Sequence, residues 1–260
     1  MDFIETLIGR PNTLKTYRSL FNNWILPEIS DPQNFTQADY YILVKEWQHS
    51  KLDPRSIKQL SSLTNRYIIH SGGKAIDTKA TCRTIIRSKQ EAPPKALSKE
   101  ELTKLLDASP PKLRPLFLLG SHAGLRLGEV FGLHWEEVDF MKGVITIKRS
   151  YSGPTKNGKT RKVPMSSQIE RMLLDLEGYK TKTGPIFKPS NPNPELRGLC
   201  KQIGISEITF HGLRHTFATL ALESGKNPKD VQKIMGHSQL STLLDIYWAG
   251  REGYMSLDFL

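Results

Sequence analysis

The sequence predicts a mainly α-helical protein with one small antiparallel β-sheet. Apolar residues recur at helical spacing along most of the 260 residues, and capping residues, glycines and prolines separate these helical segments. Two segments, 143–151 and 160–166, instead carry β-branched residues in alternation, which is typical of strands. The pair Asn157-Gly158 between them is a turn signal, so the two strands are expected to form a hairpin.

The first 90 residues are expected to form an all-helical domain. Pro54 suits the first turn of a helix, and Gly72-Gly73 would end that helix. Pro93-Pro94 stops a helix and favours an extended chain, which predicts a linker over residues 91–97. The helices expected in this first domain cover residues 12–28, 36–48, 54–72 and 77–88.

Residues 98–260 are expected to form a second domain that contains the hairpin. Ser98 followed by Glu101 is the pattern of a capping box, and Gly124 suits the C-terminal end of a helix. The helices expected in this second domain cover residues 99–108, 112–123, a short segment within 125–133, 166–176, 193–203, 211–224, 227–235 and 240–248.

The composition indicates a basic protein of the cell interior. There are 37 Lys and Arg residues against 26 Asp and Glu, and the net charge of +11 favours a polyanionic partner. No apolar run approaches the roughly 18 residues of a membrane span, and the N-terminus lacks the pattern of a signal peptide. Cys82 and Cys200 lie far apart, which argues against a disulfide framework or a zinc ribbon. We therefore expect a cytoplasmic protein without membrane contact.

The expected hairpin lies inside a strongly basic stretch. Residues 140–169 contain no acidic residue. Both a solvated face and a phosphate-binding surface are compatible with such a run, and its length favours the second. The residues expected to form such a phosphate-binding surface are Lys148, Arg149, Lys159, Arg161 and Lys162.

Two histidines and an arginine are expected on one face of a helix in the segment HGLRHTFATL. His211, Arg214 and His215 stand at positions i, i+3 and i+4 of that helix. A metal site needs further ligands, and the sequence offers neither an HExxH motif nor a nearby cluster of carboxylates or cysteines. We therefore expect no metal here.

Three more segments carry polar residues at unusual places. AGLRLGE places Arg126 at a bend between helices and Glu129 one helical turn later, and KNGK places Lys156 at the hairpin tip. MGHSQLSTLLDIY places His237 after a glycine and Tyr247 in a short helix near the C-terminus. Each residue alone fits a surface or core position, and the ordered combination is the informative signal.

Along the chain the four segments follow the order AGLRLGE, KNGK, HGLRHTFATL and MGHSQLSTLLDIY. With the segments in this order, residues 98–260 closely resemble the tyrosine recombinase (phage integrase) family over about 160 residues. The first 90 residues resemble the helical core-binding domain of that family in pattern and position. The resemblance implies a two-domain clamp around double-stranded DNA. It also implies strand cleavage and rejoining through a covalent 3′-phosphotyrosyl intermediate, without a cofactor, a metal or ATP.

The resemblance assigns the central roles in that reaction. Tyr247 corresponds to the nucleophile, and Arg126 and Arg214 correspond to the pair that clamps the scissile phosphate. Lys156 corresponds to the hairpin lysine that protonates the departing 5′ oxygen, and Lys159 flanks the same turn and is its rival for that role.

The resemblance also assigns supporting roles. His211 corresponds to a residue that assists proton transfer, and His237 to a histidine that hydrogen-bonds the phosphate. Glu129 corresponds to an acidic residue that buttresses the arginines, and His215 is expected to be structural or supporting.

The family's biological outcomes are not separated by these residues. We expect a site-specific recombinase of the integrase type; the alternatives are an Xer-like multimer resolvase, a type IB topoisomerase-like enzyme, and a DNA-binding module without catalysis. The implied partners are DNA core sites, a homotetramer on DNA formed from monomers, and accessory DNA-bending or directionality factors. The segment after Tyr247 is expected to dock either on its own domain or on a neighbouring protomer.

Overall fold

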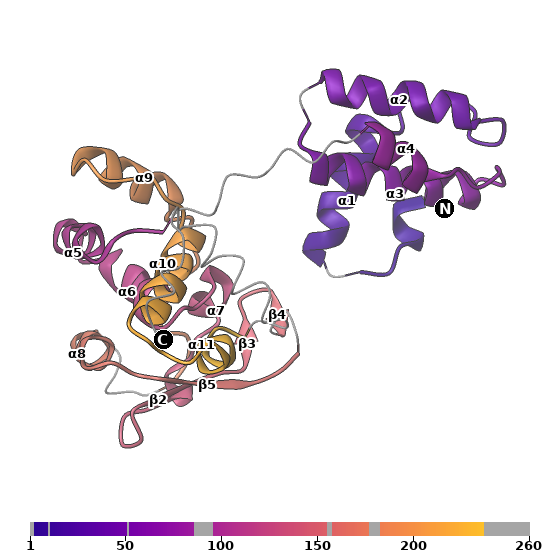
Figure 1. The fold of residues 1–260 in the computed structure, drawn as a ribbon. Coiled ribbons are helices and arrows are strands. Elements are labelled where there is room, and N and C mark those ends of the chain that lie inside the picture. Colours follow the sequence, from indigo (N-terminus) through magenta and orange to yellow (C-terminus); the bar gives the residue numbers. More distant parts are fainter. Residues whose placement is uncertain are drawn as a thin grey trace, which may run out of the picture. The chain divides into compact units, whose positions relative to one another are not determined.

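The computed structural model describes residues 3–9, 11–50, 52–85, 96–154, 158–176 and 183–236. The chain divides into two compact units, Met1–Glu91 and Ala92–Leu260, each with its own hydrophobic core (Figure 1). Within the described ranges no helix is long and apolar enough to cross a membrane.

The first unit is helical throughout its described residues. Thr36 and Asp39 form a reciprocal capping box at one helix start, and the Asp53 side chain caps another helix whose first residue is Pro54. One expected helix is shorter than the sequence suggested, because it ends at Trp24 ahead of a proline that cannot continue it. The elements are η1 (Phe3–Thr6), α1 (Pro11–Trp24), α2 (Gln37–His49), α3 (Pro54–His70) and α4 (Thr78–Ile85).

The second unit combines helices with short strands. Ser98 and Glu101 form the expected capping box at its first helix. Its elements are α5 (Lys99–Ala108), α6 (Arg114–His122), α7 (Leu127–Phe131), η2 (Trp135–Glu137), β1 (Val138–Asp139), β2 (Val144–Ile147), β3 (Arg149–Ser150), β4 (Gly153–Pro154), β5 (Arg161–Pro164), α8 (Ser167–Asp175), α9 (Asn193–Gln202), α10 (Phe210–Glu223) and α11 (Pro228–Met235).

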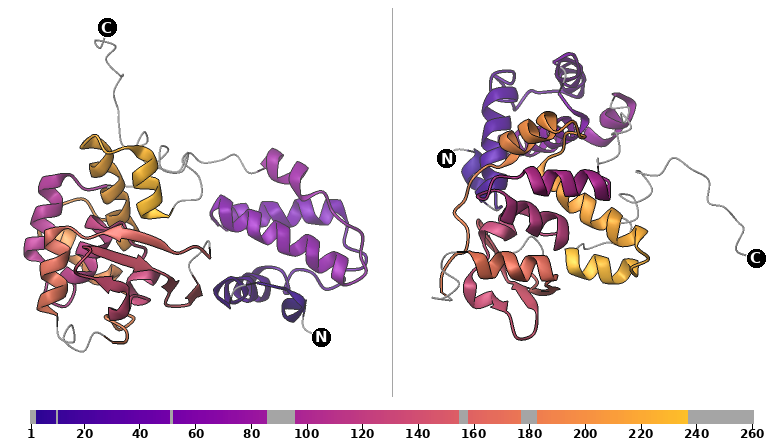
Figure 2. Two further views of the ribbon diagram at one scale, coloured as in Figure 1. Left: turned by 90° about the horizontal axis from the view of Figure 1, so that it is seen from below. Right: turned by 90° about the vertical axis from the view of Figure 1, so that its left-hand side faces the viewer.

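The expected antiparallel pairing joins β2 to β5, with Ile145 opposite Val163 and Ile147 opposite Arg161. The expected strand over 143–151 is divided into β2 and β3. Two-residue strands that the sequence did not suggest complete the sheets: β1 extends the β2–β5 sheet to the order β1-β2-β5, and β4 pairs with β3. The β2–β5 sheet lies at one edge of the unit, beside the helices (Figures 1 and 2). The mainly helical class with a small antiparallel sheet is therefore confirmed.

Helix α6 lies at the centre of this unit's core. Its residues 115–121 are all buried, and it packs most extensively against α10. Gly120 allows this close packing, because a Cβ atom there would lie 3.1 Å from a ring carbon of Phe210 and 3.2 Å from Leu213 Cβ. The contact holds α10 near the bend that follows α6, where Arg126 lies, and near α7, which carries Glu129.

Candidate active site

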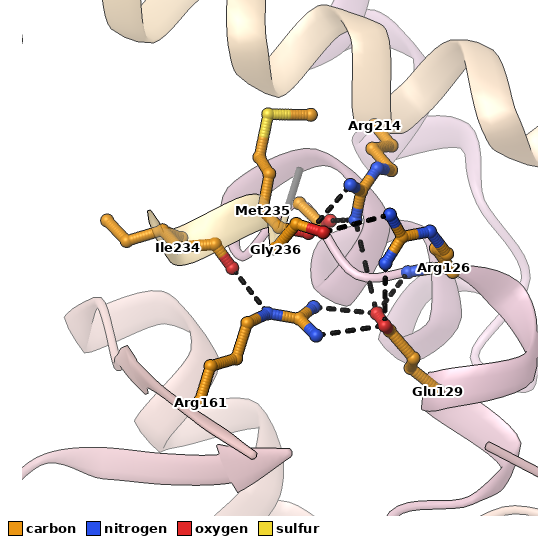
Figure 3. A network of polar contacts seen from close by, with 8 residues as sticks. Arg126, Glu129, Arg161, Arg214, Ile234, Met235 and Gly236 are labelled. Carbon is orange, nitrogen blue, oxygen red and sulfur yellow. Dashed lines mark hydrogen bonds and ion pairs between the residues drawn. The ribbon is translucent and has the colours of Figure 1, made fainter. Parts of the chain in front are cut away.

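Four charged side chains from different parts of the second unit meet beside the end of α11 (Figure 3). Arg126 immediately precedes α7 and Glu129 lies within it, Arg161 begins β5, and Arg214 lies in the middle of α10. We call these four residues the arginine cluster. Arg126, Glu129 and Arg214 were expected to act together, whereas Arg161 was expected to contact DNA.

The bend between α6 and α7 positions Arg126. Gly124 takes a left-handed conformation with φ of 62°, and a Cβ atom at this position would lie 2.6 Å from the Phe217 ring, so glycine is required on both counts. The Arg126 backbone N–H donates to Glu129 Oε2 at 2.9 Å, and its Nη1 donates to Glu129 Oε1 at 2.9 Å. Glu129 therefore holds both the backbone and the side chain of Arg126.

Glu129 is the shared acceptor of the cluster. Its side chain is 2% exposed, and it also accepts from Arg161 through Nη1 at 2.9 Å and Nη2 at 2.6 Å. Burial would raise the pKa of this carboxyl, but the hydrogen bond and charge of Arg161, with the Arg126 contacts, lower it to about 2. Glu129 is therefore an anion at any physiological pH.

Arg214 is enclosed by protein, with 1% of its surface exposed. Its Nη1 donates to the Gly124 carbonyl at 2.6 Å and its Nη2 to the Met235 carbonyl at 2.7 Å, while Nη1 lies 4.0 Å from Glu129 Oε2. Burial, followed by the positive charge of Arg126, lowers the pKa of Arg214 to about 9. The guanidinium is still a cation at neutral pH.

The last carbonyl groups of α11 accept hydrogen bonds from three different arginines. Arg161 Nε donates to Ile234 at 2.6 Å, Arg214 to Met235, and Arg126 Nη2 to the Gly236 carbonyl at 3.2 Å (Figure 3). The final carbonyls of a helix lack intrahelical partners and carry the negative end of the helix dipole, so cations are favourable there. The chain leaving α11 toward residue 237 thus starts at the arginine cluster.

The two histidines of α10 lie next to each other one turn apart. The ring centroids of His211 and His215 are 4.5 Å apart and the rings are nearly perpendicular. His211 is exposed, whereas burial, with the neighbouring charges of His211 and Arg214, lowers the pKa of His215 to about 4. His215 is therefore neutral at physiological pH, and its ring packs edge-on against the exposed imidazole of His211.

The sequence pattern that describes the phage integrase family matches residues 95–252. The chain belongs to this family. Tyrosine recombinases of this family cleave and rejoin DNA strands, so the expected family and class of enzyme are confirmed.

Relatives align with nearly the whole length of this chain. The tyrosine recombinase XerD of Listeria monocytogenes is 27% identical and aligns with 93% of this chain and 90% of its own. The XerC-like tyrosine recombinase of Caldanaerobacter subterraneus is 26% identical, with coverage of 92% and 74%.

Solved structures show the same fold at lower identity. The Tn1549 transposon integrase in complex with a circular intermediate DNA has a TM-score of 0.77 at 18% identity, and the alignment covers 98% of this chain and 93% of that one. A lambda integrase dimer bound to a core site has a TM-score of 0.74 at 18% identity, with coverage of 99% and 95%.

Three expected site residues, Lys156, His237 and Tyr247, lie outside the described residues. The other expected catalytic and supporting residues all lie on α10 or at the start of α7. The cluster brings Arg126 and Arg214 near one acceptor, Glu129, at 2.9 and 4.0 Å.

The residues expected to contact DNA do not share one environment. Lys148, Lys159 and Lys162 are exposed, and the exposed Arg149 forms an ion pair with Glu137 at 3.0 Å. Arg161 differs, because its side chain is only 11% exposed and it pairs with Glu129.

The signal for an inward-facing Arg161 was present in the sequence. Successive residues of a strand face opposite sides, so Arg161 shares a face with Val163, which is buried, and Lys162 and Pro164 are exposed. The net basic charge of the segment obscured this alternation.

Proposed function

We propose that the protein is a site-specific DNA recombinase of the integrase type, and that the arginine cluster is its phosphate-binding centre. The observation that carries this proposal is the convergence of three guanidinium groups on one carboxylate, with Arg214 buried among them. Three positive charges and one negative charge leave the cluster with a net charge of +2.

That net charge suits the transition state of the reaction better than its ground state. A DNA phosphodiester carries one negative charge. When the tyrosine oxygen attacks and loses its phenolic proton, the pentacoordinate phosphate group carries two negative charges. Cations that are fixed and enclosed before the reaction stabilise this added charge without reorganisation. Arginine is suited to this role because its planar fork donates two parallel hydrogen bonds and stays charged.

The chemical step follows from the family's pattern. The Tyr247 oxygen forms a bond to phosphorus, and the bond from phosphorus to the 5′ oxygen breaks. Lys156 donates a proton to the leaving 5′ oxygen, with Lys159 as the alternative donor, and His211 and His237 assist proton transfer and phosphate binding. The 3′-phosphotyrosyl link keeps the bond energy, so attack by a 5′-hydroxyl rejoins the strand without ATP.

The assembly and biological role are proposed from the relatives. One solved neighbour is described as a lambda integrase tetramer bound to a Holliday junction, which supports a homotetramer on DNA for this chain. The two compact units fit a two-domain clamp, with residues 91–97 as its linker. The relatives come from bacteria and archaea, so we place the enzyme in the cytoplasm of such a cell. Their Xer names keep multimer resolution as the alternative outcome to integration.

A covalent trapping experiment tests the proposal and also finds the target DNA. A library of nicked duplexes with randomised sequence is incubated with the full chain, and the nick lets the freed 5′-hydroxyl fragment diffuse away. Adducts that resist denaturing detergent are isolated, and their DNA is sequenced. We expect adducts with the wild-type protein and none with Tyr247→Phe. An adduct formed by Tyr247→Phe, or none formed by the wild type, would refute the mechanism.

A further inference from the structure

Arg161 contacts two other elements from its own strand, and all three lie beside expected site residues. It lies at the start of β5, on the strand that leads back from the hairpin tip. Its guanidinium reaches Glu129 in α7 through both Nη atoms and the Ile234 carbonyl at the end of α11 through Nε (Figure 3). A single side chain therefore connects the hairpin, the helix of the buttressing carboxylate and the segment that leads to residue 237.

The hydrogen bonds of Glu129 show what Arg161 does for its neighbours. A carboxylate has about four lone-pair positions. Arg126 uses one on each oxygen, and Arg161 uses the second on each oxygen. The carboxylate is thus fully occupied, and Arg214 stays 4.0 Å away with its own bonds to the Gly124 and Met235 carbonyls.

The end of α11 packs closely on the same guanidinium. A Cβ atom on Gly236 would lie 3.1 to 3.3 Å from Arg161 Cδ, Nη1 and Cζ. Gly236 also takes the left-handed conformation with φ of 66°. The chain at residue 236 therefore lies in close contact with the Arg161 side chain, which leaves little room for a larger residue.

We propose that Arg161 is a positioning residue for strand cleavage: it occupies Glu129 and the end of α11, so that Arg126 and Arg214 keep the positions from which they act on the scissile phosphate. This inference rests on the proposed function. Arg161 does so from within the protein, and it is not a member of the DNA-contacting surface formed by its exposed neighbours. Its charge also keeps the cluster at +2; without it the cluster has a net charge of +1, and Glu129 regains two acceptor positions that attract Arg214.

Two substitutions separate the charge of Arg161 from its shape. Arg161→Gln removes the charge, and Arg161→Lys keeps the charge but replaces a planar fork by a point charge that cannot bridge both oxygens of Glu129 and a carbonyl group. The double variant Arg161→Gln with Glu129→Gln restores the net charge of +2 and removes the carboxylate that would attract Arg214.

The cleavage rate is measured in single turnover on the duplex recovered by trapping, at saturating DNA, and the DNA affinity is measured separately. We expect Arg161→Gln to lower the cleavage rate by about 100-fold, which is the size of the effect when an active site loses one hydrogen-bond donor to the transition state. The DNA affinity should change by less than about threefold. We expect Arg161→Lys to lie between this variant and the wild type, and the double variant to cleave at least about tenfold faster than Arg161→Gln.

Two control variants give the experiment its contrast. Lys162→Gln changes the exposed neighbour on the opposite face of β5, where a direct DNA contact is expected, and it should weaken DNA affinity. Arg197→Gln, on an exposed position of α9, should change neither quantity.

Different outcomes would refute the positioning role of Arg161 and the proposed recombinase function. A wild-type cleavage rate for Arg161→Gln, or a defect seen only in affinity, would overturn the positioning role while leaving the recombinase function intact. A double variant no faster than Arg161→Gln would overturn the route through Glu129. Rescue in the double variant also shows that the single variant failed in the site and not in folding. Absence of any wild-type adduct would instead count against the proposed function.

Discussion

Replacing Glu129 by glutamine removes the carboxylate on which Arg126 and Arg161 converge, while keeping the shape of the side chain. Both guanidinium groups then lose a charged partner, and three positive charges lie close together without a counter-charge. Breaking a buried ion pair by removing one partner costs about 3–5 kcal/mol of folding free energy. We therefore expect Glu129→Gln to destabilise the second unit strongly.

The pKa of Glu129 gives a second route to the magnitude. The ordinary value is 4.5 and the folded protein lowers it to about 2. At 1.36 kcal/mol per pKa unit, that difference corresponds to about 3 kcal/mol, in agreement with the loss of a buried pair. With a urea m-value of about 2 kcal/mol/M, the unfolding midpoint should fall by about 1.5 M at pH 7.

The sign of the pH dependence follows from the lowered pKa. The ionised carboxylate contributes its stability above pH 4.5, and this contribution is lost as the pH falls toward 2. Glutamine mimics the protonated carboxyl, so the difference in stability between wild type and Glu129→Gln should be largest at neutral pH and shrink across this window.

Urea unfolding followed by circular dichroism measures these midpoints, and amide exchange of α10 identifies the transition of the second unit. Glu223→Gln, at an exposed position near the end of α10, is the matched control and should leave the midpoint almost unchanged. A Glu129→Gln variant as stable as the wild type at pH 7, or a stability difference that stays constant from pH 5 to pH 2, would refute the reasoning.

Two further changes test the surroundings of the cluster. Gly236→Ala places an alanine in the left-handed conformation, at a cost of about 1–2 kcal/mol, and puts its Cβ atom 3.1 Å from Arg161 Cδ. Thermal unfolding should show a lower midpoint for this variant, and an unchanged midpoint would contradict the packing described. Because the pKa of His215 is lowered, its imidazole is protonated in the unfolded chain at pH values where it stays neutral in the folded chain. The free energy of unfolding should therefore fall as the pH drops from 6.5 to about 4. His215→Leu should remove that part of the pH dependence in urea midpoints, and an identical slope in the variant would argue against the lowered pKa.

Local sequence patterns determined much of the fold. The capping residues Thr36 and Ser98, and Pro54 at a helix start, act within four residues of themselves, so their structural effect is visible in the sequence. The two-residue strands β1 and β4 escaped prediction, because two residues are too few to show a period.

The class of reaction also follows from the sequence, since the ordered motifs around Arg126 and Arg214 are sufficient to identify the family. Which groups these charged side chains contact depends on the tertiary structure. Arg161 meets Glu129 across 32 residues, and Arg126 meets the Gly236 carbonyl across 110. Alternation along β5 can indicate that Arg161 faces inward, but it cannot show which buried acceptor the side chain of Arg161 meets. Its role depends on which distant segments pack against its strand, and packing is a property of the whole fold.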